Sequence, residues 1–215
     1  MEASRKTIGW QGTVLAETYR VLQRLGKGGM GEVYEAEHLR VGKKVAVKFM
    51  KGDVSDDRRA IERFRREVRA LSAITSEYVV SVLDCGDLDG ETPYVVMERL
   101  YGEDLRHLLA REAPLSVYRA LRFALHAWAG LAAVHEAGLV HRDLKPANLF
   151  VTRTESSGEL CKILDFGVAK KQASDATGQG ALIGTLRYMA PEQLSDGATV
   201  APTTDVYAIG AILFE

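Results

Sequence analysis

The feature that most constrains this chain is a pair of short polar segments, HRDLKPAN at residues 141–148 and DFG at residues 165–167. The residues that follow the first segment (149–152) and those that precede the second (161–164) are predicted to be short β-strands. A hairpin of these two strands would bring the end of the first segment to the start of the second. The chain is therefore expected to fold so that the two polar segments meet.

The residue types in these segments are those that phosphoryl transfer to a hydroxyl requires. Asp143 can accept the proton of the hydroxyl, and Lys145 can reach the transferring phosphate. Asn148 and Asp165 offer the hard oxygen ligands that Mg²⁺ prefers beside nucleotide phosphates. Each residue alone is more often part of an ordinary turn. The prediction of a catalytic site therefore depends on the four residues together.

A glycine-rich segment, GKGGMGEV at residues 26–33, lies between two runs that are predicted to be strands, residues 19–25 and 32–37. Residues 43–50 predict a third strand of the same antiparallel sheet. Because Gly31 leads into a strand and not into a helix, the segment is not a dinucleotide-binding turn, and the absence of Gly-Lys-Ser/Thr excludes a Walker-type loop. A hairpin whose glycine backbone can approach phosphate oxygens remains.

Lys48 lies in the third of these strands, between apolar neighbours, where a buried ammonium group needs an anionic partner. The helix predicted for residues 57–75 offers Glu67, which lies at the edge of an apolar stripe. The stripe consists of Ile61, Phe64, Val68 and Leu71. The alternative is that Glu67 pairs with Arg63 on a solvated face of the helix.

Two further patterns complete the predicted elements. Asp89-Gly90 predicts a hairpin turn between strands at residues 79–85 and 93–99. Ser116 is predicted to cap a long helix. The stripe that we expect this helix to turn toward the core consists of Leu121, Leu125, Trp128, Leu131 and Val134.

Composition excludes several classes of protein. The 215 residues are 47% hydrophobic and 27% charged with a net charge of −1, so the chain lacks the basic excess of a nucleic-acid-binding protein. Cys85 and Cys161 are the only cysteines, which argues against a disulfide framework or a zinc site and for a reducing compartment. No apolar run is long enough to span a bilayer, and we expect a cytoplasmic protein without a membrane segment.

These motifs, with VAVK at 45–48, APE at 190–192 and DVYAIG at 205–210, follow one another in an order that resembles the catalytic domain of a bacterial serine/threonine protein kinase of the eukaryotic-like, Hanks type. The resemblance covers residues 19–215. It implies an α+β, two-lobed protein kinase fold, in which a small antiparallel β N-lobe with one helix joins a mainly helical C-lobe.

The resemblance also implies a division of the chain. Residues 1–17 are expected to be a flexible tail, residues 18–97 the N-lobe and residues 98–215 the C-lobe. Because the sequence stops inside the apolar run 207–214, the C-lobe is expected to lack its last helices, including the arginine that would pair with Glu192. We expect this chain on its own to be marginally stable and weak in catalysis.

By resemblance, ATP lies under the glycine-rich hairpin with Mg²⁺ on its phosphates. For Asp104 an alternative is a carboxylate that complements the start of a helix, and for Met97 the alternative is a core residue. The residues assigned to nucleotide binding are Leu25, Gly26, Lys27, Gly28, Gly29, Met30, Gly31, Glu32, Val33, Ala46, Lys48, Glu67, Met97, Glu98, Leu100 and Asp104.

The resemblance assigns Asp143, Lys145 and Asn148 to catalysis and Asn148 and Asp165 to the metal. His141 is expected to have a structural role against Phe166, and not to act as an acid or base. The resemblance also gives supporting roles to residues outside this set. Asp205 would accept backbone N–H groups of the catalytic loop, Thr185 would contact Asp143 and Lys145, and a phosphate on Thr177, or on Ser174, would be held by Arg142 and Lys170.

The implied activity is the ATP-dependent transfer of a γ-phosphate to serine and threonine hydroxyls of proteins, with autophosphorylation of the segment before Ala190, in signal transduction. Lys145 and the Gly184-Thr185 pair match the serine/threonine pattern and not the tyrosine pattern. The resemblance is compatible with a homodimer for mutual phosphorylation. The alternative is a nucleotide-binding kinase fragment or scaffold without turnover.

Overall fold

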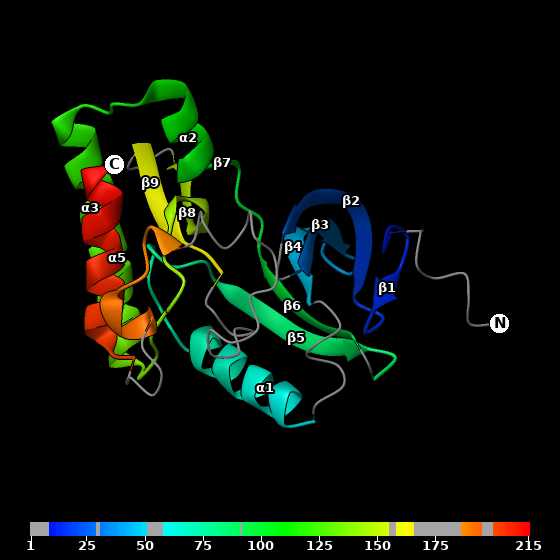
Figure 1. The fold of residues 1–215 in the computed structure, drawn as a ribbon. Coiled ribbons are helices and arrows are strands. Elements are labelled where there is room, and N and C mark those ends of the chain that lie inside the picture. Colours follow the sequence, from blue (N-terminus) through cyan, green and yellow to red (C-terminus); the bar gives the residue numbers. More distant parts are fainter. Residues whose placement is uncertain are drawn as a thin grey trace. The chain divides into compact units, whose positions relative to one another are not determined.

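The computed structural model describes residues 9–28, 31–50, 58–90, 92–154, 158–165, 186–194 and 200–215, and in helix α1 it leaves out the side chains of residues 58–60 and 63 (Figure 1). The chain divides into two compact units. The first contains Met1–Val68 and Val82–Leu100, and the second contains Arg69–Ser81 and Tyr101–Glu215. Each unit is described by itself.

The first unit is built on one six-stranded antiparallel sheet with the strand order β1-β2-β3-β4-β6-β5. Consecutive strands are neighbours except where β6 lies between β4 and β5. This sheet confirms the strands predicted around the glycine-rich segment. The strands are β1 (Val14–Leu15), β2 (Tyr19–Gly28), β3 (Gly31–His38), β4 (Lys44–Met50), β5 (Val82–Leu88) and β6 (Thr92–Glu98).

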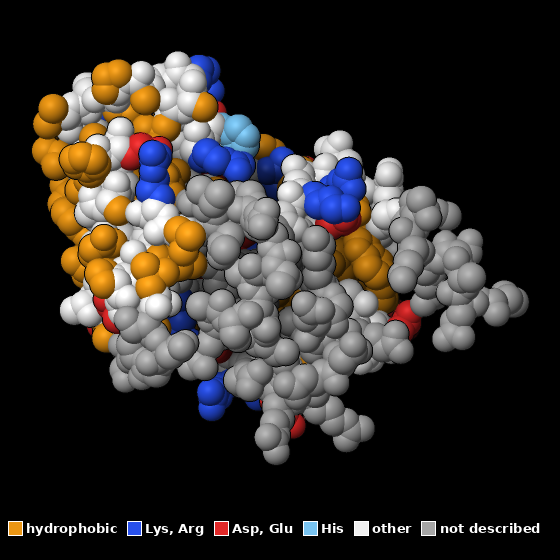
Figure 2. Space-filling model, viewed as in Figure 1, with side chains coloured by type: hydrophobic (Ala, Val, Ile, Leu, Met, Phe, Trp, Pro, Cys, Tyr) orange, Lys and Arg blue, Asp and Glu red, His pale blue; other side chains and the backbone are white. Residues whose placement is uncertain are grey.

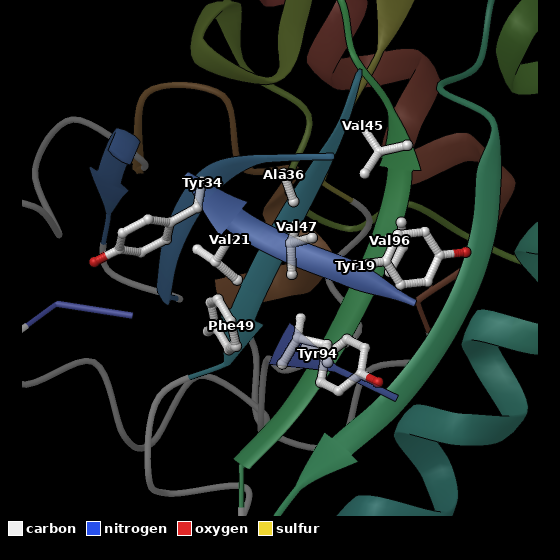
Figure 3. Close-up of a cluster of buried hydrophobic side chains, with 10 residues drawn as sticks. Tyr19, Val21, Tyr34, Ala36, Val45, Val47, Phe49, Tyr94 and Val96 are labelled. Carbon is white, nitrogen blue, oxygen red and sulfur yellow. The ribbon is translucent and has the colours of Figure 1, made fainter. Parts of the chain in front are cut away.

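The two faces of this sheet differ because side chains alternate along each strand. One face holds an apolar cluster that includes Tyr34, Val47 and Phe49 (Figure 3). Phe49 lies 5.8 Å from Tyr34 and 6.1 Å from Tyr94 between ring centroids. The other members are Leu15, Tyr19, Val21, Ala36, Val45, Tyr94 and Val96. Burial of this face stabilises the sheet.

The chain before β2 is part of this core. The indole of Trp10 stacks on Phe49 with 4.7 Å between ring centroids. Leu15 is 1% exposed, and β1 pairs with β2 through Leu15 and Tyr19. The expectation of a flexible tail over residues 1–17 is therefore wrong for residues 9–17, because Trp10 and Leu15 bury apolar surface on the sheet. Residues 1–8 lie outside the described residues.

Helix α1 (Arg58–Ser72) ends three residues before the predicted boundary. Three members of its predicted stripe are buried, Phe64, Val68 and Leu71, and Arg65 forms an ion pair with Asp87 of β5. The strand predicted at residues 79–85 is observed as β5, at Val82–Leu88. Val79, which precedes β5 and belongs to the second unit, pairs instead with Ile163 of β9. The turn at Asp89-Gly90 is confirmed, with φ of 56° and 75°.

The second unit combines a three-stranded antiparallel sheet with helices. The sheet has the order β7-β8-β9, and its last two strands form the predicted hairpin, with Leu149 opposite Ile163. Helices α3 and α5 lie side by side (Figure 1). The elements are β7 (Gly102–Asp104), α2 (Leu105–Glu112), α3 (Val117–Glu136), the 3-10 turn η2 (Pro146–Asn148), β8 (Leu149–Thr154), β9 (Gly158–Ile163), the 3-10 turn η4 (Pro191–Leu194) and α5 (Pro202–Phe214).

Helix α3 begins as predicted, because the Ser116 hydroxyl accepts a hydrogen bond from the N–H of Arg119. The predicted core stripe is wrong at Leu121, Leu125 and Trp128, which are 50%, 60% and 39% exposed. The residues that α3 buries are Phe123, Ala124, Ala127, Gly130, Leu131 and Val134. Figure 2 shows hydrophobic side chains on the surface where α3 and α5 lie.

The buried face of α3 is made of small residues where it meets β9. A Cβ added at Gly130 would lie 2.9 Å from Ile163 Cδ1 and 2.9 Å from the carbonyl oxygen of Tyr78. Glycine therefore lets the helix approach the hairpin closely enough to fix its position. None of the helices in the described part of the chain has the length and apolar character needed to cross a membrane.

Candidate active site

The catalytic loop (residues 141–148) is anchored by a buried carboxylate on α5. Asp205 is 1% exposed, and its two oxygens accept the N–H groups of His141 at 2.8 Å and Arg142 at 2.9 Å. His135 of α3 places its Nε2 2.8 Å from Asp205 Oδ2. Hydrogen bonds to a carboxylate offset the cost of burying it. The predicted role of Asp205 is confirmed by these contacts.

His141 supports the loop from inside. The ring is fully buried, its Nε2 lies 2.8 Å from the carbonyl oxygen of Leu164, and its Nδ1 accepts the N–H of Asp143 at 3.3 Å. This pattern assigns the proton of the neutral ring to Nε2. Burial lowers the pKa of His141, which keeps the ring neutral. The ring therefore occupies the structural position that the sequence predicted, while Phe166 lies outside the described residues.

The three residues predicted to be catalytic meet around one carboxylate. Lys145 Nζ lies 3.0 Å from Asp143 Oδ2. Asn148 Nδ2 donates to the carbonyl oxygen of Asp143 at 2.7 Å and approaches Oδ2 at 3.4 Å. Asp143 is 4% exposed and Asn148 is 6% exposed. The carboxylate is thus held by a cation and an amide, and its position is fixed before any substrate binds.

The β8–β9 hairpin joins the second predicted carboxylate to this loop. The N–H of Leu164 donates to the carbonyl oxygen of Asn148 at 2.8 Å, so Asp165 follows directly from a residue bonded to the loop. Asp165 has a φ of 49° and Arg142 a φ of 66°. Both are non-glycine residues in the left-handed region, which is sparsely populated and often occupied at functional sites.

The sheet of the first unit places four of the predicted nucleotide-binding residues on one face. Antiparallel partners project to the same face, and Val33 lies opposite Lys48 while Ala46 lies opposite Met97. Their neighbours Tyr34, Val45 and Val47 belong to the apolar cluster on the other face. Lys48 is 7% exposed and Glu67 is partly buried. Leu25 lies within β2, Glu98 is the last residue of β6, and Leu100 lies two residues beyond that strand.

The glycines of the hairpin differ from one another. A Cβ at Gly26 or Gly28 would meet nothing within 4 Å. A Cβ at Gly31, where φ is 151°, would lie 2.0 Å from the carbonyl oxygen of Phe49. Gly31 is therefore required by the β3–β4 ladder itself. Lys27 pairs with Glu32 at 3.1 Å across the hairpin.

Asp104 supports the structural alternative that the sequence left open. Its side chain caps α2 by accepting the N–H of His107 at 3.0 Å, and its Oδ2 lies 2.8 Å from His107 Nδ1. Several predicted residues lie outside the described ones and stay predictions. They are Gly29, Met30, Gly167, Lys170, Ser174, Thr177, Gly184 and Thr185.

The sequence motifs did not predict three residues that contact the catalytic loop, its anchor Asp205 or the Ala-Pro-Glu motif. Gln193 bonds the carbonyl oxygen of Arg142 at 2.8 Å, Thr204 donates to Glu192 at 2.7 Å, and His135 contacts Asp205. Gln193 directly follows the Ala-Pro-Glu motif, so the sequence could have located it but could not have predicted what it contacts. The hydrogen bond from Thr204 lowers the pKa of Glu192.

Comparisons of sequence identify relatives of the chain. It is 41% identical over 209 residues to serine/threonine-protein kinase PknA of Mycobacterium tuberculosis, which covers 95% of this chain and 47% of PknA. It is 37% identical over 214 residues to serine/threonine-protein kinase pkn3 of Myxococcus xanthus, covering 97% of this chain and 39% of pkn3. The chain therefore spans less than half the length of these curated relatives.

The fold has solved counterparts. The kinase domain of PknI from Mycobacterium tuberculosis superposes with a TM-score of 0.76 at 29% identity, over 94% of this chain and 75% of that domain. A second PknI kinase domain structure gives the same TM-score over 95% of this chain. The sequence profile of the protein kinase domain matches residues 19–215. The chain belongs to the protein kinase domain family.

Proposed function

We propose that this chain is the catalytic part of a serine/threonine protein kinase, which transfers the γ-phosphate of ATP to serine and threonine hydroxyls of proteins. The observation that carries the proposal is the cluster in which Asp143 is held 3.0 Å from Lys145 and within reach of Asn148. Protein kinases use ATP and typically a divalent metal ion. The named relatives, which are serine/threonine-protein kinases, support the choice of substrate class.

The geometry supports a specific division of roles. Asp143 accepts the proton of the substrate hydroxyl as its oxygen attacks the γ-phosphorus. Lys145, at 3.0 Å from the same carboxylate, offsets the negative charge that develops on the transferring phosphoryl group. Asn148 holds the backbone and the carboxylate of Asp143 through one amide group, so that the base stays oriented toward the acceptor.

The donor set fits a magnesium ion. Asn148 and Asp165 supply an amide oxygen and a carboxylate, which are hard ligands, and the bond between Leu164 N–H and Asn148 C=O ties the two residues together. When bound, Mg²⁺ neutralises phosphate charge. In the first unit, Lys48 would bind the α and β phosphates, and Val33, Ala46 and Met97 would line the adenine site with Leu25, Glu98 and Leu100.

The remaining parts of the proposal concern regulation and organisation. Residues 18–97 and 98–215 would act as the two lobes, with Glu67 as the anionic partner of Lys48. Autophosphorylation at Thr177, with Ser174 as the second choice, would occur between two copies of the chain. Arg142, which is exposed on the catalytic loop, would be available to bind that phosphate.

An assay with γ-labelled ATP, Mg²⁺ and a generic basic protein tests the proposal. We expect label on serine and threonine, and Asp143→Asn should lower the rate by about 10² to 10⁴-fold because the proton acceptor is lost. Asp89→Asn in the β5–β6 turn makes the same chemical change at an exposed site and should retain full activity. Nucleotide binding without transfer, or label that persists in Asp143→Asn, would contradict the proposal.

A further inference from the structure

The catalytic base is connected to the Ala190-Pro-Glu192 segment by a single side chain. Gln193, in η4, donates from Nε2 to the carbonyl oxygen of Arg142 at 2.8 Å. Its Oε1 accepts the N–H of Ala190 at 3.1 Å. An acceptor faces Nε2 and a donor faces Oε1, so only one orientation of the amide satisfies both contacts. The side chain therefore bridges the catalytic loop and the Ala190-Pro-Glu192 segment, and Gln193 itself lies 51 positions after Arg142.

The carbonyl group that Gln193 holds belongs to the peptide bond joining Arg142 and Asp143. A peptide bond is planar, so whatever fixes its oxygen also fixes its N–H. That N–H, on Asp143, donates to His141 Nδ1 at 3.3 Å. The peptide plane before the catalytic base is thus held on both sides, by Gln193 at the oxygen and by His141 at the nitrogen. Rotation of this plane would move the Asp143 carboxylate.

The backbone at this point needs such support. Arg142 has a φ of 66°, a sparsely populated conformation that is strained for a residue other than glycine. The preceding peptide is held separately, because the N–H of Arg142 donates to Asp205 Oδ1 at 2.9 Å. Asp205 and His141 act on the N–H groups of the loop, and Gln193 acts on the carbonyl group between Arg142 and Asp143.

We propose that Gln193 is a positioning residue that sets the orientation of Asp143 and couples it to the Ala190-Pro-Glu192 segment. This inference rests on the proposed kinase function. Its consequence is that the Ala190-Pro-Glu192 segment and the base that acts on the substrate hydroxyl move as one piece. Gln193 touches neither substrate nor nucleotide in this account, so its loss should change turnover and leave ATP affinity unaltered.

Two substitutions separate the two contacts of Gln193. Gln193→Glu keeps the oxygen that accepts the N–H of Ala190 but places a second oxygen against the carbonyl of Arg142. Gln193→Met keeps the length of the side chain and removes both contacts. Gln11→Glu, in an exposed turn of the first unit, makes the same chemical change as the first variant and serves as its control.

Steady-state kinetics gives the first readout. Both Gln193 variants should lower kcat roughly 10- to 100-fold, because a small displacement of a catalytic group has effects of that size. The KM for ATP should change by less than about twofold, since ground-state binding of nucleotide is untouched. Gln11→Glu should match the unsubstituted protein. Unchanged kcat in Gln193→Glu, with activity in the unsubstituted protein, would overturn the proposal.

Hydrogen exchange gives a second readout that does not require activity. The Asp143 N–H should exchange faster in both variants, whereas the Ala190 N–H should lose protection in Gln193→Met and keep it in Gln193→Glu. Amides of β9 (Gly158–Ile163) should be unaffected. This pattern in a protein that never phosphorylates would sustain the coupling and reject the kinase function. Faster exchange throughout β9 would reject the coupling itself, and so would an unchanged exchange rate of the Asp143 N–H.

Discussion

The catalytic loop and the glycine-rich hairpin (residues 24–33) differ in burial and in the hydrogen bonds that hold them. In the loop, His141, Asp143 and Asn148 are buried, and they are bonded to α5, to the residues after β9 and to one another. Residues 24–28 of the hairpin are exposed and pair with β3 along the strand ladder. The side chains proposed to act in catalysis are therefore held in one geometry before a substrate binds. The strand that is proposed to cover the nucleotide is instead exposed to solvent.

The two regions differ in how many buried polar groups need hydrogen-bond partners. Buried polar groups are costly unless they are bonded, and a bonded network holds a single geometry. The loop meets this condition through Asp205 and His141. The hairpin has few buried polar groups to satisfy, so exposed backbone around Gly26 and Gly28 remains available to a ligand. Substitutions in the two regions should therefore have very different consequences.

The largest effect is expected for Asp205→Ala in the loop network. The change leaves the N–H groups of His141 and Arg142 without their acceptor, at about 1–3 kcal/mol of unfolding free energy for each. We expect a large loss of stability together with a loss of phosphorylation. Chemical denaturation followed by circular dichroism measures the first. A variant with unaltered stability would show that Asp205 does not hold the loop.

The next effect separates two glycines of the hairpin. Gly31→Ala should destabilise the protein by about 3 kcal/mol or more, because the new Cβ would overlap the Phe49 carbonyl and the backbone has a positive φ. Gly26→Ala should change the unfolding free energy by less than about 1 kcal/mol, because its Cβ would meet open space. Equal effects of the two substitutions in denaturant titrations would contradict the structure.

The smallest expected effect is a pH dependence of the unfolding free energy that is caused by His141 in the catalytic loop. Burial lowers the pKa of His141 below its usual value of about 6.5, so below that pH the unfolded chain binds a proton that the folded chain does not. The unfolding free energy should therefore fall with decreasing pH, by at most about 1.4 kcal/mol per pH unit for this group. The window runs from about pH 6.5 down to the lowered pKa.

Denaturant titrations at several pH values, with His141→Gln as the comparison, measure this contribution. The variant should show a shallower fall in stability below pH 6.5 than the unsubstituted protein. Burial also lowers the pKa of His126, which adds a slope of the same sign in both proteins. An identical slope in the two proteins would mean that His141 takes up a proton without unfolding.

The sequence predicted the strands and the catalytic cluster because the signals there are local. Alternation along β3 and β4 separates Val47 from Lys48, and the spacing of Asp143, Lys145 and Asn148 lies within one loop. The role of Gln193 could not be predicted, because it depends on which carbonyl group the amide meets, and that group belongs to a residue 51 positions earlier in the chain. The role of Trp10 depends in the same way on a contact with distant Phe49.

The error in α3 has a geometric cause. Steps of three residues fall about 60° short of a full turn, so the series Leu125, Trp128, Leu131 and Val134 drifts from one face of the helix to the other. Its first members are exposed and its last two are buried. Apolar residues occupy both faces of α3, and periodicity cannot choose between them. The buried face is marked instead by Gly130, where β9 approaches.

Paramagnetic broadening tests most directly whether the catalytic loop and Asp165 together hold a metal-loaded nucleotide. Mn²⁺ would replace Mg²⁺ in a complex with a non-hydrolysable ATP analogue, and backbone amide signals would be recorded. We expect the amide signals of Asp143 and Leu164 to lose intensity, and we expect removal of both metal ligands, by Asn148→Ala with Asp165→Asn, to abolish the effect. Signals of Asp143 and Leu164 that keep their intensity, or broadening that is unchanged in the double variant, would contradict this assignment.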